Sequence, residues 1–134
     1  LARTLTQIES CGLRPGESET FVVDNASTDG TAAMVRERFP RVNLIALSRN
    51  GGGVSRNEGL RRAAGEFVVL LDDDSYPMPG SVRRMVEHFR AAPTLGAAVF
   101  EVMLPDGRRE CSAYPDVFIG CGTGFRRAAL EQVG

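Results

Sequence analysis

Four short apolar runs recur along the chain, and segments with helical spacing separate them. The runs are "TFVVD" at 20–24, "VNLIAL" at 42–47, "EFVVLL" at 66–71 and "LGAAVFEVML" at 95–104. Runs of this length are typical of strands buried on both faces of a parallel sheet. Strands that alternate with helices predict an α/β fold, with a mostly parallel, twisted sheet and helices on both of its faces.

The segments around these runs carry the helix and turn signals. Four helices are expected before residue 92. The first begins near Leu1, and the second runs from Thr28 or Asp29 to Pro40. The third passes through Leu60 and Ala64, and the fourth spans Pro79 to Ala91. Beyond them, "PDG" predicts a turn followed by an antiparallel strand near 108–113. The final segment, 118–134, predicts a glycine-rich loop and a short helix, with Arg126 and Arg127 in a solvated first turn.

Composition limits the class of protein. A length of 134 residues suits one domain with its own core, and a net charge of -1 gives no field that favours nucleic acid. No apolar stretch approaches the length of a membrane span. Three cysteines, Cys11, Cys111 and Cys121, indicate reduced thiols in a cytosolic setting, and with His88 as the single histidine they do not predict a zinc site. All 16 basic residues are arginine, which excludes mechanisms that need lysine.

Three consecutive carboxylates, Asp72 to Asp74, follow the "EFVVLL" run, and Asp24 ends an earlier run. The carboxyl ends of parallel strands meet at one edge of a sheet, where ligands bind. The acidic run has three interpretations. Asp74 or Ser75 can cap the next helix, the carboxylates can bind Mg²⁺ or Mn²⁺, or the run can be a phosphoacceptor site, a type that uses a lysine. In an extended segment Asp72 and Asp74 face the same side and can share one ion.

Three segments, "FVVDNASTDGT", "RNEGLRRAAGEFVVLLDDDSYPMPG" and "GTGFRRAALEQVG", resemble in order and spacing the successive motifs of family 2 glycosyltransferases. The resemblance covers nearly the whole chain and implies the Rossmann-like GT-A fold. It further implies metal-dependent transfer of a sugar from a nucleotide-diphosphate sugar to an acceptor hydroxyl, with inversion. A non-catalytic sugar-nucleotide-binding module and a nucleotidyltransferase-like enzyme are the alternatives.

The resemblance also implies roles for the acidic residues. Asp72, Asp73 and Asp74 match the D-x-D motif, in which Asp74 and Asp72 would bind Mg²⁺ or Mn²⁺ while Asp72 and Asp73 would contact the nucleotide sugar. Asp24 and Asn25 stand where the family contacts the nucleobase. Many members have two acids there, so Asn25 leaves the base preference open, and a cap that starts a turn is the alternative for Asp24.

Two further matches come from glycine-rich segments. Arg56 and Asn57 match the R-N that follows the glycine-rich loop, where Arg56 would contact the diphosphate unless it is a solvated helix arginine. The loop itself, "NGGGVS", is one residue shorter than the common family form. Gly122, Thr123 and Gly124 resemble the segment on the acceptor side, where small residues let the backbone approach a sugar; a tight turn is the alternative.

Two family segments have no match here. The family opens with a strand of the "VIPTYN" type and carries its general base, an Asp or Glu, after the position of Gly134. We therefore expect 1–134 to be a single partial GT-A domain with an uncovered sheet edge, able to bind donor and metal but inactive alone. The expected partners are the donor and a saccharide, lipid-linked or other hydroxyl acceptor, but not nucleic acid. The expected location is the cytoplasm, or the membrane surface through peripheral association of the full protein.

Overall fold

The structure is a computed structural model that describes residues 1–14, 16–110 and 120–133. The chain falls into two compact units. One consists of residue 1, residues 3–13 and the chain from Glu66 onward, and the other consists of Ala2 and residues 14–65. Each unit combines helices with a sheet of its own, which confirms the α/β class. The expectation of a single domain stays a prediction.

The 14–65 unit is built on two parallel strands, β1 (Phe21–Asp24) and β2 (Asn43–Ala46). Its helical elements are α2 (Thr31–Arg38), a 3-10 turn η1 (Gly52–Ser55) and α3 (Arg56–Arg62). These elements confirm the predicted strands and helices, with two differences at helix ends. Helix α2 begins at Thr31 rather than at Thr28 or Asp29, and α3 ends at Arg62, so the expectation that this helix passes through Ala64 is wrong. The Asp29 carboxylate accepts hydrogen bonds from the Thr31 N–H at 3.0 Å and the Thr31 hydroxyl at 2.7 Å, so Asp29 lies just before the helix.

A small core and the contacts of Glu19 help to hold this unit together. Val35 of α2 is completely buried and Phe39 is 4% exposed. The Glu19 carboxylate, just before β1, accepts hydrogen bonds from the N–H groups of Ala64 at 2.6 Å and Gly65 at 3.1 Å. Since those N–H groups follow the end of α3, Glu19 ties the start of β1 to the end of that helix.

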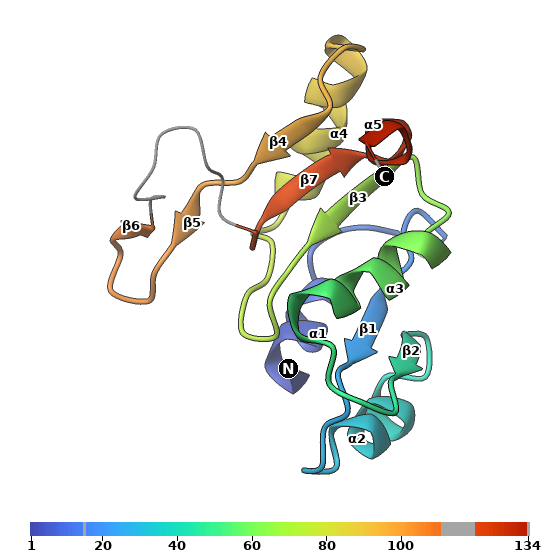
Figure 1. Ribbon diagram of the computed structural model, residues 1–134. Coiled ribbons are helices and arrows are strands. Elements are labelled where there is room, and N and C mark those ends of the chain that lie inside the picture. The colour runs from blue at the N-terminus through green and yellow to red at the C-terminus, as the bar shows by residue number, and fades with distance from the viewer. Residues whose placement is uncertain (15, 111–119, 134) are drawn as a thin grey trace. The chain divides into compact units, whose positions relative to one another are not determined.

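The other unit contains a three-stranded sheet with β7 (Thr123–Arg126) between β3 (Phe67–Leu70) and β4 (Ala97–Val99) (Figure 1). Strand β7 is antiparallel to both neighbours. The helices are α1 (Ala2–Glu9), α4 (Ser81–Ala91) and α5 (Arg127–Val133), and a hairpin joins β5 (Val102–Met103) to β6 (Arg109–Glu110). No helix in the described parts of the chain is both long enough and apolar enough to cross a membrane.

Three predictions need correction, two about this unit and one about the strand pairing among all the described residues. Residues 123–126 form the central strand of the sheet and not part of a glycine-rich loop. The run at 95–104 forms two short strands, β4 and β5, and the residues between them, Phe100 and Glu101, belong to neither strand. The pairings are also less parallel than expected, since β1–β2 is the one parallel ladder among the described residues. The antiparallel strand near 108–113 is confirmed at Arg109–Glu110, and the rest of that range lies outside the described residues.

Helix α4 supplies the core of this unit. Phe89 is completely buried and stacks on Phe67 of β3 with ring centroids 4.9 Å apart, and Met85 is 4% exposed. Arg126 covers both rings at 5.2 Å and 5.6 Å and donates hydrogen bonds to the carbonyl oxygens of Phe89 at 2.6 Å and Leu95 at 3.2 Å. The expectation of a solvated Arg126 is therefore wrong, because the end of β7 places its guanidinium against the last carbonyl groups of α4.

Each described strand except β7 keeps one side without a partner strand within the described residues. In particular, β1 pairs with β2 alone, and β3 pairs with β7 alone. An unpaired side presents backbone N–H and C=O groups that can accept another strand. The first strand that the family resemblance implies stays a prediction.

Candidate functional site

The acidic run forms a tight turn directly after β3. Strand β3 ends at Leu70, and the Ser75 N–H donates a hydrogen bond to the Asp72 carbonyl oxygen at 3.2 Å. This bond closes a turn over Asp73 and Asp74, which are both exposed. We call residues 72–75 the acid turn. The expectation of extended backbone through this run is wrong, so strand alternation no longer gives a reason to place Asp72 and Asp74 on one side.

Ser75 fixes the shape of the acid turn through its side chain. Its hydroxyl accepts a hydrogen bond from the Asp72 N–H at 3.0 Å and donates one to the Asp72 carbonyl oxygen at 3.1 Å. The Cys121 thiol donates a further hydrogen bond to the same hydroxyl at 2.9 Å. Helix α4 begins after Gly80 and has no side-chain capping bond. The interpretation of Asp74 or Ser75 as the cap of that helix is therefore wrong.

A second side chain holds the acid turn from α1. The Thr4 hydroxyl donates a hydrogen bond to the Asp73 carbonyl oxygen at 2.6 Å, and Thr4 is 4% exposed. The bonds from Thr4 to Asp73 and between Ser75 and Asp72 use backbone atoms of the turn and no carboxylate oxygen. These bonds therefore fix the turn through its backbone.

The donor chemistry of the acid turn fits a hard divalent cation. Mg²⁺ prefers oxygen ligands and usually takes one or two carboxylates, with water and substrate phosphates completing its shell. Throughout the described ranges, no three His, Cys, Asp or Glu side chains come together as a metal site. A pair of carboxylates such as Asp72 and Asp74 would leave the rest of the shell of such an ion to water or a phosphate ligand. The assignment of Asp74 and Asp72 as metal ligands stays a prediction.

The predicted acceptor-side residues lie at the start of β7. Thr123 is completely buried in this central strand. A Cβ on Gly124 would meet the side chain of Met85, so α4 leaves no room for a larger residue. The small residues at these positions thus have a packing reason. The role of Gly122, Thr123 and Gly124 toward an acceptor stays a prediction.

The predicted nucleobase contacts lie in the 14–65 unit, at the end of β1. Asp24 is 5% exposed, and its Oδ1 accepts a hydrogen bond from the Ser27 N–H at 3.0 Å. This bond is the turn-starting cap that was the alternative for Asp24. The same carboxylate ends a strand in an α/β unit, where ligands commonly bind. The contact of Asp24 with a nucleobase stays a prediction. The expectation that Asp24 and the acid turn lie at the same edge of one sheet also stays a prediction.

Asn25 contacts the glycine loop, which we define as residues 50–55. Its Oδ1 accepts hydrogen bonds from the Gly51 N–H at 2.8 Å and the Ser55 hydroxyl at 2.7 Å. Its Nδ2 donates to Asn50 Oδ1 at 2.8 Å and to the Gly52 carbonyl oxygen at 3.3 Å. The sequence did not predict these contacts, because they join residues 25 to 30 positions apart.

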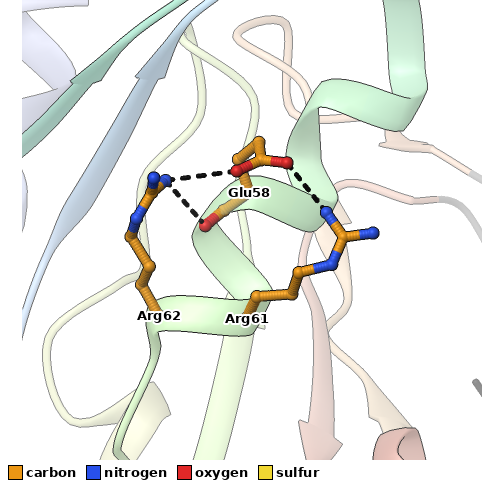
Figure 2. Close-up of polar contacts among 3 residues, drawn as sticks. All are labelled: Glu58, Arg61 and Arg62. Carbon is orange, nitrogen blue, oxygen red and sulfur yellow. Dashed lines mark hydrogen bonds and ion pairs between the residues drawn. The ribbon is translucent and has the colours of Figure 1, made fainter.

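Helix α3 begins directly after the glycine loop, with Arg56 and Asn57 exposed in its first turn. Farther along, Glu58 accepts hydrogen bonds from Arg61 at 2.8 Å and from Arg62 at 3.3 Å (Figure 2). These are exposed pairs within one helix, which contribute little to stability. Arg61 and Arg62 thus have an acidic partner on their own helix. The contact of Arg56 with the diphosphate stays a prediction.

A pocket on the surface of the same unit lies away from the predicted residues. It is lined by Phe21, residues 42–46 and Arg62. None of these residues carries a predicted role. The candidate functional residues therefore remain the acid turn in one unit and the end of β1 in the other.

The fold and these residues define the class. The chain is an α/β protein in which acidic side chains follow two strands, an arrangement typical of nucleotide-binding enzymes. The profile of the family described as "Glycosyl transferase family 2" matches residues 1–111. The chain belongs to this family, and the resemblance seen in the sequence is confirmed.

Curated relatives agree with the family. The succinoglycan biosynthesis protein ExoO of Rhizobium meliloti (strain 1021) is 42% identical over 108 residues, which cover 75% of this chain and 30% of the relative. The poly-beta-1,6-N-acetyl-D-glucosamine synthase of Staphylococcus epidermidis is 31% identical over 143 residues, which cover 88% of this chain and 34% of the relative. The chain thus spans about a third of the length of these two relatives.

Solved structures confirm the fold. Crystal structures of Staphylococcus aureus TarS 1-349, one of them in complex with UDP, match with a TM-score of 0.76 and 21% identity. The match covers 98% of this chain and 45% of the TarS chain. The expected GT-A fold is therefore confirmed.

Proposed function

We propose that this chain is the donor-binding part of an enzyme that transfers a sugar from a nucleotide-diphosphate sugar to an acceptor hydroxyl, with Mg²⁺ or Mn²⁺ at the acid turn. The observation that carries the proposal is the acid turn. Three consecutive carboxylates occupy a turn whose backbone is fixed by Thr4 and Ser75. Carboxylates concentrated in this way repel one another, and a bound cation would offset that repulsion.

The same reasoning explains why a metal and a diphosphate would bind together. Carboxylates alone would repel a diphosphate, while a divalent cation attracts both. Asp74 and Asp72 would hold the ion, and Asp73 would lie beside the ribose or sugar. When bound, the ion supplies Lewis-acid stabilisation of the nucleoside diphosphate as leaving group. The chain's own part is to hold the backbone that carries the carboxylates in a fixed turn before the ligand arrives.

The relatives support a nucleotide-sugar donor and a carbohydrate acceptor. One TarS structure contains UDP, and curated TarS is named a poly(ribitol-phosphate) beta-N-acetylglucosaminyltransferase. For this chain we propose a saccharide, lipid-linked or other hydroxyl acceptor and a cytoplasmic location, at the membrane surface where the acceptor is lipid-linked. We also propose an inverting course, which requires a general base for the acceptor hydroxyl. We assign that role to none of the described residues.

Calorimetric titration with UDP-, dTDP- and GDP-sugars, each with and without Mn²⁺, tests the proposal. We expect at least one of the three to bind, and to bind more tightly when Mn²⁺ is present. Asp74→Ala should remove the effect of Mn²⁺. Asp106→Ala changes an exposed turn aspartate of the same unit and should keep that effect, which makes it the matched control. Binding of no nucleotide sugar, or binding indifferent to both Mn²⁺ and Asp74→Ala, would contradict the proposal.

A product assay separates the enzyme from the non-catalytic alternative. The acceptor panel should include a saccharide and a lipid-linked saccharide, since both classes are proposed. A sugar-nucleotide-binding module would bind donor and metal in the titration, yet the complete protein would form no product with any acceptor. Transfer by the complete protein would support the enzyme.

A further inference from the structure

The side-chain amide of Asn25 is completely occupied by the glycine loop. An asparagine amide offers two acceptor sites on its oxygen and two N–H donors on its nitrogen. Gly51 and Ser55 fill the two acceptor sites, while Asn50 and Gly52 receive the two donors. In this arrangement Asn25 retains no hydrogen-bonding capacity for another ligand.

The partners also fix which way the amide faces. The backbone N–H of Gly51 can only donate, so it must face Oδ1. The carbonyl oxygen of Gly52 can only accept, so it must face Nδ2. Both constraints require the same orientation. A flipped amide would place like groups together at both contacts.

The glycine loop is shaped to receive this amide. A Cβ on Gly51 would lie 2.8 Å from the Ser55 hydroxyl oxygen, which is the group that contacts Asn25. Gly52 adopts a φ of +62°, in the left-handed region that favours glycine. Asn50 Oδ1 accepts a second hydrogen bond, from the Gly52 N–H at 2.8 Å. Asn25 and the loop therefore form one connected network of hydrogen bonds.

We propose that Asn25 is a positioning residue, which holds the glycine loop in place for the donor and does not contact the nucleobase. This inference rests on the proposed function and on the predicted contact of Arg56, which follows the loop, with the diphosphate of the donor. It also replaces the expectation that Asn25 helps to select the base. Holding the loop before binding reduces the entropy lost on binding, and the gain is the same for every nucleotide.

Asparagine suits this position better than aspartate does. A carboxylate has no N–H donor, so it would face Asn50 Oδ1 and the Gly52 carbonyl oxygen with lone pairs only. It could still accept from Gly51 and Ser55. Asn25→Asp therefore keeps one half of the network and turns the other half repulsive.

The first measurement tests the network without any nucleotide. Amide hydrogen exchange of Gly51 and Gly52 should be faster in Asn25→Ala than in the unchanged protein. Ser55→Ala, which keeps the amide and removes one partner, should give an intermediate rate. Asn43→Ala removes a different exposed asparagine amide, bonded to Thr20 at 3.4 Å, and should leave the loop rates unchanged. Equal rates in Asn25→Ala and the unchanged protein would overturn the proposal.

The second measurement tests the consequence for binding. Affinities for UDP-, dTDP- and GDP-sugars should each fall by about tenfold in Asn25→Ala, which loses a pre-formed loop. The ratios among the three nucleotides should stay the same, and Asn25→Asp, which turns two of the four contacts repulsive, should also weaken the binding of all three uniformly. A changed ratio would show that Asn25 contacts the base, and an unchanged affinity would show that the loop does not serve the donor. Either result would overturn the proposal.

The two measurements separate this inference from the proposed function. If the unchanged protein binds none of the three nucleotide sugars, the proposed function fails and the donor role of Asn25 fails with it. The exchange rates then still report whether Asn25 holds the loop. If Asn25→Ala does not fold, as shown by circular dichroism, Ser55→Ala carries both measurements.

Discussion

The hydroxyl of Thr4 donates a hydrogen bond to the carbonyl oxygen of Asp73 at 2.6 Å, and the two residues are 69 positions apart in the sequence. This contact ties helix α1 to the acid turn within one compact unit. A second contact supports it, since the Gly80 N–H donates to the Cys11 carbonyl oxygen at 3.4 Å. The backbone of the acidic segment is thus held by the chain's first helix and the residues just after it.

Thr4→Val tests how much this contact stabilises the unit. Valine keeps the shape of threonine but cannot donate, so the Asp73 carbonyl oxygen loses its partner. We expect the free energy of unfolding to fall by about 1–2 kcal/mol, the usual effect of leaving such a group unsatisfied. Urea unfolding measures the change. Thr6→Val, an exposed threonine of the same helix, is the control and should stay within about 0.5 kcal/mol; equal effects at both positions would refute a special role for Thr4.

Arg126→Ala tests the arginine that joins β7 to α4. The change removes hydrogen bonds to the Phe89 and Leu95 carbonyl oxygens and uncovers two stacked rings. We expect a loss of about 2 kcal/mol or more in unfolding free energy, from the hydrogen bonds and the cation–π contacts together. Arg126→Lys keeps the charge without the planar fork and should recover only part of the loss.

The matched control for Arg126 is the next residue. Arg127 pairs with Glu131 at 2.7 Å on the surface of α5, and such exposed pairs contribute little. Arg127→Ala should therefore change the unfolding free energy by less than about 0.5 kcal/mol. If Arg126→Ala proved as mild as Arg127→Ala, the structural role assigned to Arg126 would be wrong.

Acidification should weaken the start of α2. Hydrogen bonds from the Thr31 hydroxyl and N–H lower the pKa of Asp29 below its ordinary value of 3.8. A lowered pKa in the folded state means that the charged form stabilises the fold. This contribution is complete above pH 3.8, the ordinary value, and is lost as the pH falls through the lowered pKa of Asp29. Urea unfolding at a series of acidic pH values should show that the stability difference between the unchanged protein and Asp29→Asn shrinks below pH 3.8. A difference that stays constant through the acidic range would contradict the assignment.

The sequence could predict the elements whose signals are local. Strands β1, β2 and β3 are short apolar runs rich in Val, Ile and Phe, and turn residues end each of them. Helix α4 shows inward residues at spacings of three and four. These patterns depend on nearest neighbours, so one sequence sufficed to place them.

Strand β7 could not be predicted because its neighbours create it. Its sequence, "TGFR", combines the strand formers Thr and Phe with a glycine and an arginine, which makes a weak strand signal. It becomes a strand because β3 and β4 pair with it on both sides. Gly124 then serves the packing of Met85, which is far away in the sequence.

The sequence alone could identify the residues of the candidate site, but it could not predict the contacts that hold them. The acidic run itself was visible, whereas its turn depends on the Ser75 hydroxyl and on Thr4 of a distant helix. The contacts of Asn25 depend on one amide meeting four backbone or side-chain groups at once. No local pattern records such a meeting, so it could be found only in the folded chain.

The most direct test of the proposed metal site measures Mn²⁺-dependent binding of the nucleotide sugar that binds best, in Asp74→Asn against Asp106→Asn. Both changes remove one carboxylate charge and keep the shape of the side chain, but only the first lies in the acid turn. Loss of a group that merely supports a metal ligand typically costs about tenfold or more in affinity. We therefore predict that Asp74→Asn weakens Mn²⁺-dependent binding by more than about tenfold while Asp106→Asn leaves it unchanged. Equal Mn²⁺-dependent binding by the two variants would contradict the account.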